Sequence, residues 1–257
     1  MISFFKKRGL LLILTVYFIL FLGIALSDEN QDQEAIATLG MLIFTLVVVI
    51  PWIIWKIRSL LQLKKEKAQT ELLHLKSQVN PHFFFNTLNN LYALVDKDSE
   101  KARSMILKLS DMMRYSIYEG QKDWVTLEQE VDYLENYIEL HRMRYHKDID
   151  VSFNLDIQEE GYQVMPLLFI ILLENAFKHG IEKLRDDAYI RMNIIANDRL
   201  LNFSIENNFD TRELLKEPGI GLKNLKRRLE LVYPKKHYLT LSDSNGVYKA
   251  QLSLKIR

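Results

Sequence analysis

Two long apolar segments near the N-terminus constrain this chain more than any other feature of its sequence. Residues 10–26 and 39–55 contain no charged side chain. Each is near the lower length limit for a helix that spans a bilayer, roughly 17 to 25 residues. We predict that residues 1–57 form a transmembrane region with these two spans. The alternative for the first segment is a cleavable signal peptide, because Ala25-Leu26-Ser27 resembles a small-residue cleavage site.

The distribution of basic residues predicts how these spans are oriented. Lysine and arginine occur before the first span and after the second, whereas the loop between them carries acidic residues and no basic one. The residues concerned are Lys6, Lys7, Arg8, Lys56, Arg58, Lys64, Lys65 and Lys67 on the flanks and Asp28, Glu29, Asp32 and Glu34 in the loop. Basic flanks stay in the cytoplasm. We therefore expect a multi-pass protein of the inner or plasma membrane, in contact with lipid, with its C-terminal part in the cytoplasm.

The composition excludes several kinds of site and domain. There is no cysteine, so disulfides, thiolate nucleophiles and Cys-ligated metal centres are excluded. The 34 basic residues nearly balance the 33 acidic ones, so the charge gives no reason to expect direct binding of nucleic acid. The outer loop of about a dozen residues is too short for a folded sensor domain. We expect any signal to be read in the membrane, at that loop or through a partner.

The segment SQVNPHFFFNTL, residues 77–88, places a proline and a histidine inside an expected long helix. The apolar stripe of that helix resumes after the proline two positions late, a rotation of roughly 200°. The stripe consists of Leu61, Ala68, Leu72, Leu75 and Val79 before the proline and Phe84, Leu88, Leu91 and Val95 after it. Pro81 cannot donate a backbone hydrogen bond, which predicts a kink or local unwinding of the helix. The kink would expose His82, with Asn86 one turn further on to hydrogen-bond its ring; the alternative is a histidine packed in the core.

A second amphipathic helix follows, and Gly120 lies just past its end. Its apolar stripe is Ala102, Ile106, Leu109, Met113 and Ile117. The connection at residues 96–99 is short, so the two helices should be antiparallel neighbours. Two helices with one apolar stripe each bury too little surface alone. We predict a homodimer in which two hairpins, residues 58–120 of each copy, form a four-helix bundle.

Residues 121–257 have the pattern of an α+β domain. A capping box at residues 126–129 opens one helix, and Pro166 is expected to open another that ends at Gly180. Alternating apolar residues predict strands near residues 149–157, 190–194 and 201–205, and a last hairpin with its turn at Asn245-Gly246. We expect one layer of helices on an antiparallel or mixed sheet.

Three polar features of this domain fit a nucleotide pocket. Asn175, Lys178 and His179 share one face of a helix by their spacing. Asn207 continues an inward-facing strand series where another apolar residue is expected. Gly219-Ile220-Gly221 precedes a helix, and glycines there let backbone N–H groups approach phosphate. Each feature alone has an ordinary explanation, namely a solvated helix face, a turn-forming asparagine or a loop.

Three segments together resemble the LytS/YehU-type sensor histidine kinases. LKSQVNPHFFFNTLNNLYAL, LLENAFKHG and GIGLKNLKRRLELVYP are similar to the phosphoacceptor motif, N box and glycine box of that family. The resemblance runs from about residue 72 to the C-terminus. It implies a dimeric histidine phosphotransfer hairpin in residues 58–120. It also implies an ATP-binding α+β sandwich of the Bergerat (GHKL) kind in residues 121–257.

The resemblance also implies roles for single residues. His82 would accept the phosphoryl group, with Asn86 beside it. Asn175 would hold Mg²⁺ that is bridged to the phosphates of ATP. The further nucleotide-binding residues would be Lys178 and His179 on the phosphate side, Gly219 and Gly221 at the lid, and Lys223 and Asn224 just after it.

The sequence departs from the pattern of these kinases at two places. Glu206-Asn207-Asn208 stands where they commonly have Asp-x-Gly at the adenine site. An asparagine carbonyl can still accept from the adenine amino group, so we assign this role to Asn207. Phe83 stands where many of them carry an acidic base. A neutral imidazole needs little help, because its reference pKa is about 6.5; Glu174 is a candidate base.

From these features we expect a membrane-bound sensor histidine kinase. It would use ATP and Mg²⁺ to phosphorylate His82 and pass the phosphoryl group to an aspartate of a response regulator. The resemblance implies a regulator with a LytTR-type DNA-binding domain. One alternative is a GHKL-type ATPase or ATP-gated switch in which His82 is only structural. Another is a catalytically inactive membrane scaffold.

Overall fold

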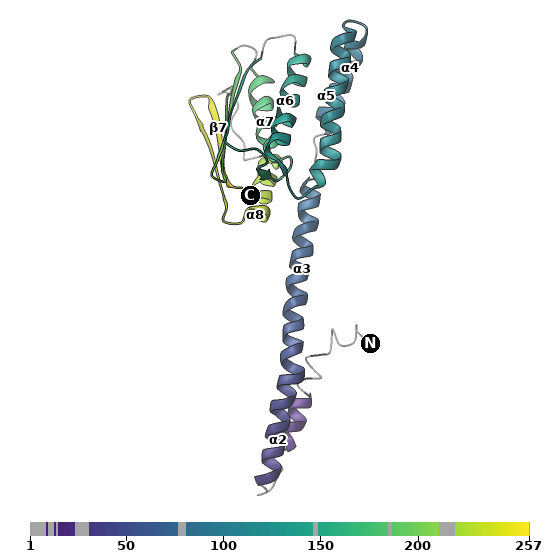
Figure 1. Cartoon of the computed structure of the whole chain (residues 1–257), viewed down its shortest axis with the longest axis vertical. Coiled ribbons are helices and arrows are strands. Elements are labelled where there is room, and N and C mark those ends of the chain that lie inside the picture. The colour runs from purple at the N-terminus through teal and green to yellow at the C-terminus, as the bar shows by residue number, and fades with distance from the viewer. Residues whose placement is uncertain are drawn as a thin grey trace. The chain divides into compact units, whose positions relative to one another are not determined.

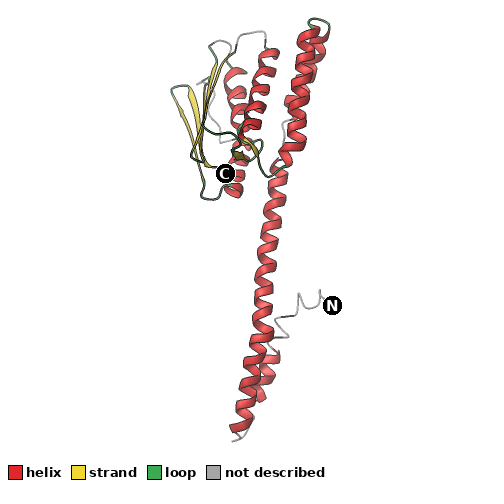
Figure 2. Ribbon diagram, viewed as in Figure 1, coloured by secondary structure: helices red, strands yellow, loops and turns green. Residues whose placement is uncertain are grey.

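A computed structural model of the chain shows helices in its N-terminal part and helices with a sheet in its C-terminal part (Figure 1, Figure 2). The structure describes residues 9, 13, 15–23, 31–76, 81–145, 149–184, 187–210 and 219–256. It divides the chain into unit 1, residues 1–69, and unit 2, residues 70–257. The predicted boundaries at residues 57 and 120 remain predictions.

Every described residue of unit 1 is helical. Residues 15–23 form one helix. A second runs through α2 (Gln31–Phe44), the π-helical turn η1 (Thr45–Val49) and the first part of α3 (Ile50–Lys76). In this second helix, Thr38–Leu72 is long and apolar enough to cross a membrane, and it includes the predicted span 39–55.

The two helices of unit 1 are in contact. The hydroxyl groups of Tyr17 and Thr45 form a hydrogen bond, and the ring of Tyr17 meets that of Phe44 edge-on at 5.7 Å between centroids. The predicted span 10–26 lies partly outside the described residues. Crossing of the membrane by two helices therefore stays a prediction.

Unit 2 begins at the end of α3 and continues into a helical hairpin. α3 ends at Lys76, and α4 (Pro81–Val95) begins at Pro81. Pro81 takes the first position of a helix, where a missing amide proton costs nothing. The predicted kink falls on residues 77–80, outside the described residues. After a short turn, the Asp98 carboxylate caps α5 (Ser99–Tyr118) by accepting from the Lys101 amide at 3.0 Å.

The face of α5 that packs inside unit 2 is not the predicted one. The buried residues are Ala102, Met105, Leu109, Met112 and Ser116, so the stripe is shifted by one position over most of its length. The predicted stripe residues Ile106, Met113 and Ile117 are exposed. α5 therefore has two apolar faces. One packs on α6, and the other is open in the single chain.

Next along the chain, a short link leads from the hairpin to α6 (Leu127–Arg144), through η2 (Glu119–Gln121) and β1 (Val125–Thr126). The predicted capping box is confirmed, because Thr126 Oγ1 accepts from the Gln129 amide at 3.3 Å and the Gln129 side chain accepts from the Thr126 amide at 3.0 Å. In Figure 1, α6 lies between α5 and the sheet.

The sheet has five strands in the order β2-β4-β5-β7-β6. β2 (Asp150–Ile157) and β4 (Tyr189–Asn197) are parallel, and the other pairs are antiparallel, so the predicted mixed sheet is confirmed. The remaining strands are β5 (Leu200–Asn208), β6 (His237–Ser244), β7 (Val247–Lys255) and the short β3 (Gln163–Val164), which pairs with β1.

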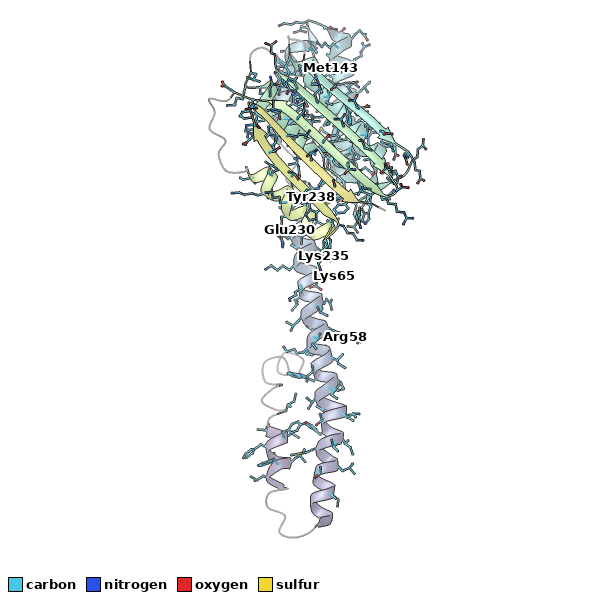
Figure 3. All side chains as sticks on the ribbon, turned by 90° about the vertical axis from the view of Figure 1, so that its left-hand side faces the viewer. Arg58, Lys65, Met143, Glu230, Lys235 and Tyr238 are labelled. Carbon is cyan, nitrogen blue, oxygen red and sulfur yellow. The ribbon has the colours of Figure 1, made fainter. Side chains whose placement is uncertain are left out.

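One face of the sheet is covered and the other is open. Along β4 and β5, buried residues alternate with more exposed ones, as a sheet packed on one side requires. The covering layer consists of α6, α7 (Ile170–Ala176) with the π-helical turn η3 (Phe177–Ile181), and α8 (Ile220–Val232). Figure 3 looks onto the open face, with the exposed Tyr238 of β6 labelled.

The expected helix start at Pro166 is wrong. Leu167 has φ 54°, in the left-handed region, and α7 begins only at Ile170. The reason is a long-range contact that the local pattern does not reveal. The guanidinium of Arg228 on α8 donates to the carbonyl of Leu167 at 2.9 Å and to that of Pro166 at 2.6 Å. Together with the left-handed φ of Leu167, these bonds hold the residues before α7 in a turn.

Candidate functional site

The candidate site begins with Asn175, in the last turn of α7. Its side chain is half-buried, and the Nδ2 atom is buried without a hydrogen-bond partner among the described residues. Buried polar groups in native proteins are nearly always paired. The helix continues as the π-turn η3, a feature that occurs frequently at functional sites. An amide left unpaired here fits a group that binds a ligand from outside the chain.

Asn207 lies next to the end of this helix. It is buried, at 1% exposed, as the inward-facing series on β5 predicts, and its Nδ2 donates to the Asn208 carbonyl at 3.0 Å. A Cβ atom on Gly180 would lie 3.0 Å from that carbonyl oxygen and 3.1 Å from Asn207 Nδ2. Any larger residue at position 180 would have to displace this backbone by a few tenths of an ångström, so the glycine allows η3 to approach β5 closely. The structure thus brings together the helix that carries Asn175 and the strand end that carries Asn207.

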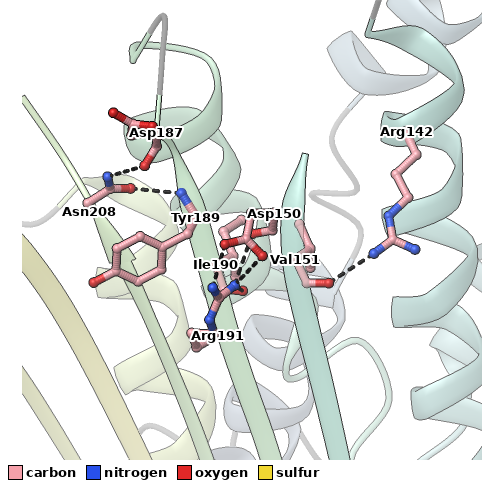
Figure 4. A network of polar contacts seen from close by, with 8 residues as sticks. All are labelled: Arg142, Asp150, Val151, Asp187, Tyr189, Ile190, Arg191 and Asn208. Atoms are coloured by element: carbon pink, nitrogen blue, oxygen red, sulfur yellow. Dashed lines mark hydrogen bonds and ion pairs between the residues drawn. The ribbon is translucent and has the colours of Figure 1, made fainter. Parts of the chain in front are cut away.

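Asn208, by contrast, has a structural role (Figure 4). Its side chain accepts from the Tyr189 amide at 2.9 Å and donates to the Asp187 carbonyl at 2.7 Å. Nearby, Arg191 and Asp150 form an ion pair across β4 and β2, with Nη1 and Oδ1 2.6 Å apart. Because these bonds occupy the amide of Asn208, Asn207 is the better candidate to contact a base.

The start of α8 lies against α7. Gly219 precedes α8 as its N-cap residue, without a side-chain cap, and both Gly219 and Gly221 are exposed. A Cβ on Gly221 would stand 3.6 Å from Ile171 Cγ2 of α7, an ordinary van der Waals contact. The first amides of α8 are therefore near the helix that carries Asn175, and helix N-termini attract anions. The polar segment at residues 211–218 lies outside the described residues.

The other predicted nucleotide residues are placed less closely. Lys178 and His179 lie in the wider turn of η3 and are exposed. The prediction that they share a face with Asn175 assumed α-helical spacing, and the α-helix ends at Ala176. Lys223 is exposed on α8, and the half-buried residues are Glu174 on α7, Asn224 on α8 and Asn86 on α4. Their assigned roles remain predictions.

His82 is the second residue of α4, and its side chain lies outside the described residues. The next residue, Phe83, is buried. Its ring packs on Tyr137 at 4.6 Å and on His141 at 5.4 Å, both on α6. On its other side, His141 packs on Phe177 of η3 at 4.1 Å. This aromatic cluster, Phe83, Tyr137, His141 and Phe177, connects the first turn of α4 to the helix that carries Asn175.

The sequence contains a signal for this cluster that the motif analysis missed. Tyr133, Tyr137, His141 and Tyr145 recur every four residues along α6. Such spacing places them on one face of a helix. The aliphatic residues Leu127, Val131, Leu134 and Ile138 form a second apolar face of the same helix. Aromatic rings that alternate with that face indicate that α6 packs on two sides.

His141 has an unusual environment for a titratable side chain. Both ring nitrogens are buried without a hydrogen-bond partner among the described residues. Burial, with a smaller effect of the Arg144 charge, lowers the pKa of the imidazole from 6.5 to about 2. Below pH 6.5 the unfolded chain therefore binds a proton that the folded chain does not bind. The free energy of unfolding is therefore not reduced by His141 protonation above pH 6.5, and it decreases as the pH falls below that value.

We predict that His141→Phe stabilises unit 2 and weakens its pH dependence. Phenylalanine keeps the ring stacking and removes the unpaired polar atoms, a gain of about 1 kcal/mol at pH 7.5. In the parent chain His141 alone should cost about 2 kcal/mol between pH 6.5 and 5.0, and this loss should be absent in the variant. Urea unfolding of both chains in detergent at these pH values, followed by tyrosine fluorescence, measures the difference. Equal pH slopes would contradict the prediction.

Comparison with known proteins finds similarity to histidine kinases and to LytS sensor proteins. The sequence profile of the histidine kinase family matches residues 70–149. The sensor protein LytS of Staphylococcus saprophyticus is 33% identical over 191 residues, 67% of this chain and 32% of that protein. LytS of Streptococcus agalactiae serotype V is 31% identical over 196 residues, 71% of this chain and 34% of that protein. The chain thus spans about a third of the length of these curated relatives.

Among solved structures, the histidine kinase AdeS of Acinetobacter baumannii aligns with this chain at 13% identity and a TM-score of 0.38. The alignment covers 66% of this chain and 92% of that one.

Proposed function

We propose that this chain is a sensor histidine kinase of the LytS type, a class that it resembles through the region that matches, and that it phosphorylates itself on His82. ATP is the donor, and an aspartate of a response regulator is the final acceptor. The observation that carries the proposal is the aromatic cluster. Phe83, directly after His82, and Phe177 both pack on Tyr137 and His141. Phe177 lies two residues after Asn175, whose Nδ2 atom is buried without a hydrogen-bond partner among the described residues.

The proposed ATP site combines residues of α7, η3, β5 and the start of α8. The Asn207 Nδ2 bond to Asn208 orients the amide so that Oδ1 is the acceptor for the adenine amino group. The amides at the start of α8, with Gly219 and Gly221, face the phosphates, and Lys178 adds positive charge. Asn175 would hold Mg²⁺ through its Oδ1 atom, and the bound ion would supply positive charge near the phosphates. This arrangement is the Bergerat, or GHKL, type.

The proposed transfer needs positioning more than proton abstraction. A neutral His82 nitrogen attacks the γ-phosphorus; an N–P bond forms, the bond from that phosphorus to the β–γ bridging oxygen breaks, and ADP leaves. The imidazole then loses its remaining proton to solvent, because its reference pKa is about 6.5. Phe83 is packed against α6 and holds the first turn of α4 there. Glu174 is close in sequence to Asn175 and is the candidate to assist the proton.

The surroundings of the site fit a signalling protein. The apolar helix Thr38–Leu72 supports membrane attachment. The proposed arrangement has two spans, at residues 10–26 and 39–55, and both chain ends in the cytoplasm. The exposed apolar face of the hairpin supports a homodimer with a four-helix bundle. We propose a response regulator of the LytTR type as partner, because that class is implied by the family resemblance.

The proposal is tested by incubating the full-length chain in detergent with γ-labelled ATP and Mg²⁺. We expect acid-labile, alkali-stable label on the chain and none on His82→Gln. Phosphate release without label would instead indicate an ATPase or ATP-gated switch. No label and no nucleotide binding would indicate a scaffold. A fluorescent ATP analogue, displaced by ATP, measures binding separately from transfer.

A further inference from the structure

Glu130 of α6 is buried at the meeting point of three parts of unit 2. It is 1% exposed. Its Oε1 accepts from the Tyr115 hydroxyl of α5 at 2.7 Å and from the Leu167 amide at 2.6 Å. Its Oε2 accepts from the Leu168 amide at 3.0 Å. One carboxylate thus holds the hairpin and the turn that leads into α7.

Arg228 of α8 completes this arrangement from the other side. It is buried, and it donates to the carbonyls of Pro166 and Leu167, in the same turn whose amides Glu130 binds. The charges of Glu130 and Arg228 attract each other. Burial raises the pKa of the Glu130 carboxyl, whereas its three hydrogen-bond donors and Arg228 oppose that rise. The turn is therefore held through both its amides and its carbonyls.

This turn sets the position of the proposed nucleotide site. α7 begins three residues after Leu167 and carries Asn175, while α8, fixed to the same turn by Arg228, starts at the glycines proposed to face the phosphates. The left-handed φ of Leu167 is a conformation that a non-glycine residue keeps only where its surroundings impose it. Apolar packing alone would not need such a buried charged pair, which is costly to desolvate.

We propose that Glu130 is a positioning residue that couples the hairpin, through Tyr115, to the turn at Leu167 and so to the nucleotide-binding helices α7 and α8. The effect on phosphorylation rests on the proposed kinase function. The coupling of Tyr115 to the Leu167 turn does not depend on that function and can be measured without ATP. Loss of the Tyr115 hydroxyl acts on the orientation of the hairpin, whereas loss of the Glu130 charge acts on the nucleotide site itself.

The chain offers a matched control for the first substitution. Ser116, the neighbour of Tyr115 on α5, also gives one hydroxyl to α6, bonded to the Tyr133 hydroxyl at 3.0 Å. No hydrogen bond between these two residues and the Leu167 turn is present in the described part of the chain. Tyr115→Phe and Ser116→Ala therefore each remove one hydroxyl between α5 and α6, and only the first removes a hydrogen bond to Glu130.

The first readout is amide hydrogen exchange of the full-length chain without nucleotide. We expect Tyr115→Phe to speed exchange of the Leu167 and Leu168 amides by on the order of tenfold, because their acceptor loses a partner. Ser116→Ala should leave these amides unchanged. Equal effects of the two substitutions on this turn would overturn the proposal, whether or not the chain phosphorylates itself.

The second readout separates nucleotide affinity from transfer. Tyr115→Phe should leave the affinity for the fluorescent ATP analogue within about twofold and slow labelling of His82 by on the order of tenfold. Glu130→Gln should weaken nucleotide affinity itself by on the order of tenfold. If Glu130 had only a structural role, the substitutions would change neither nucleotide affinity nor the rate of labelling, or they would lower both in proportion to the loss of folding stability. If Glu130→Gln does not fold, the exchange comparison of Tyr115→Phe with Ser116→Ala still decides.

Discussion

Replacing Asn175 with alanine is expected to lower phosphorylation by ATP at least a hundredfold while leaving the fold as stable as before. The two effects separate for a physical reason. Nδ2 of this side chain is buried without a partner among the described residues, so its removal breaks no hydrogen bond of that atom and exposes no new unpaired group. One preorganised polar group at a reacting phosphate is worth about 10² to 10³ in rate.

The test pairs autophosphorylation with urea unfolding and uses Asn154→Ala as its control. Asn154 is an exposed asparagine on β2 that hydrogen-bonds the Asn193 side chain at 3.0 Å, on the open side of the sheet. The control should keep full activity. If Asn175→Ala kept more than a tenth of the activity, or lost activity only in proportion to lost stability, Asn175 would not be part of the nucleotide site.

Leu88→Asp is expected to convert a dimeric chain into a monomer. Leu88 and Leu91 of α4, with Ile106, Leu109 and Met113 of α5, line an open groove of ≈ 400 Å³. A second hairpin seated on this face would bury Leu88 in both copies, at about 1.5 to 3 kcal/mol for each side chain. An aspartate would instead place two like charges in an apolar interface. We expect the dissociation constant to rise by about a thousandfold or more.

The matched control is Leu155→Asp on β2. Leu155 is 44% exposed and Leu88 is 46% exposed, so the two substitutions change side chains of the same kind and nearly the same accessibility. Sedimentation velocity in detergent should show a dimer for the parent chain and for Leu155→Asp, and a monomer for Leu88→Asp. Two variants with the same sedimentation behaviour would show that the hairpins do not form the interface.

Local patterns in the sequence predict much of unit 2 correctly. The strands β4 and β5 follow from alternation, the hairpin β6–β7 follows from alternation and its turn at Asn245-Gly246, and the capping box at Thr126 is present as expected. The inward orientation of Asn207 follows from the same alternation. These features depend on neighbours within a few residues, which is the range that periodicity reads.

The predictions that are wrong, the start of α7 and the buried face of α5, fail because contacts between distant residues decide them. Arg228 occupies the carbonyls before α7, 61 and 62 residues earlier in the chain, and so delays the start of that helix. α5 has two apolar faces, and only its packing on α6 decides which one is buried in the single chain. The aromatic cluster joins Phe83 to α6 and η3, more than fifty residues apart.

The candidate site shows the same division. The residue types and their order, Asn175, Asn207 and the glycines before α8, could be identified from the sequence. Their mutual placement could not, because it depends on Gly180, which lets η3 approach β5, and on Glu130 and Arg228, which fix the turn before α7. Gly180 and Arg228 lie within the segments LLENAFKHG and GIGLKNLKRRLELVYP, but the sequence does not reveal which distant residues they contact, and Glu130 lies outside both segments. They are recognised only once the chain is folded.

The central claim is that the γ-phosphoryl group of ATP ends on the His82 imidazole. Phosphorus NMR of the full-length chain after incubation with ATP and Mg²⁺, and removal of nucleotide, tests it directly. The account predicts a phosphoramidate resonance that disappears on acidification and is absent from His82→Gln. A parent chain without that resonance, or one whose resonance persists in His82→Gln, would contradict it.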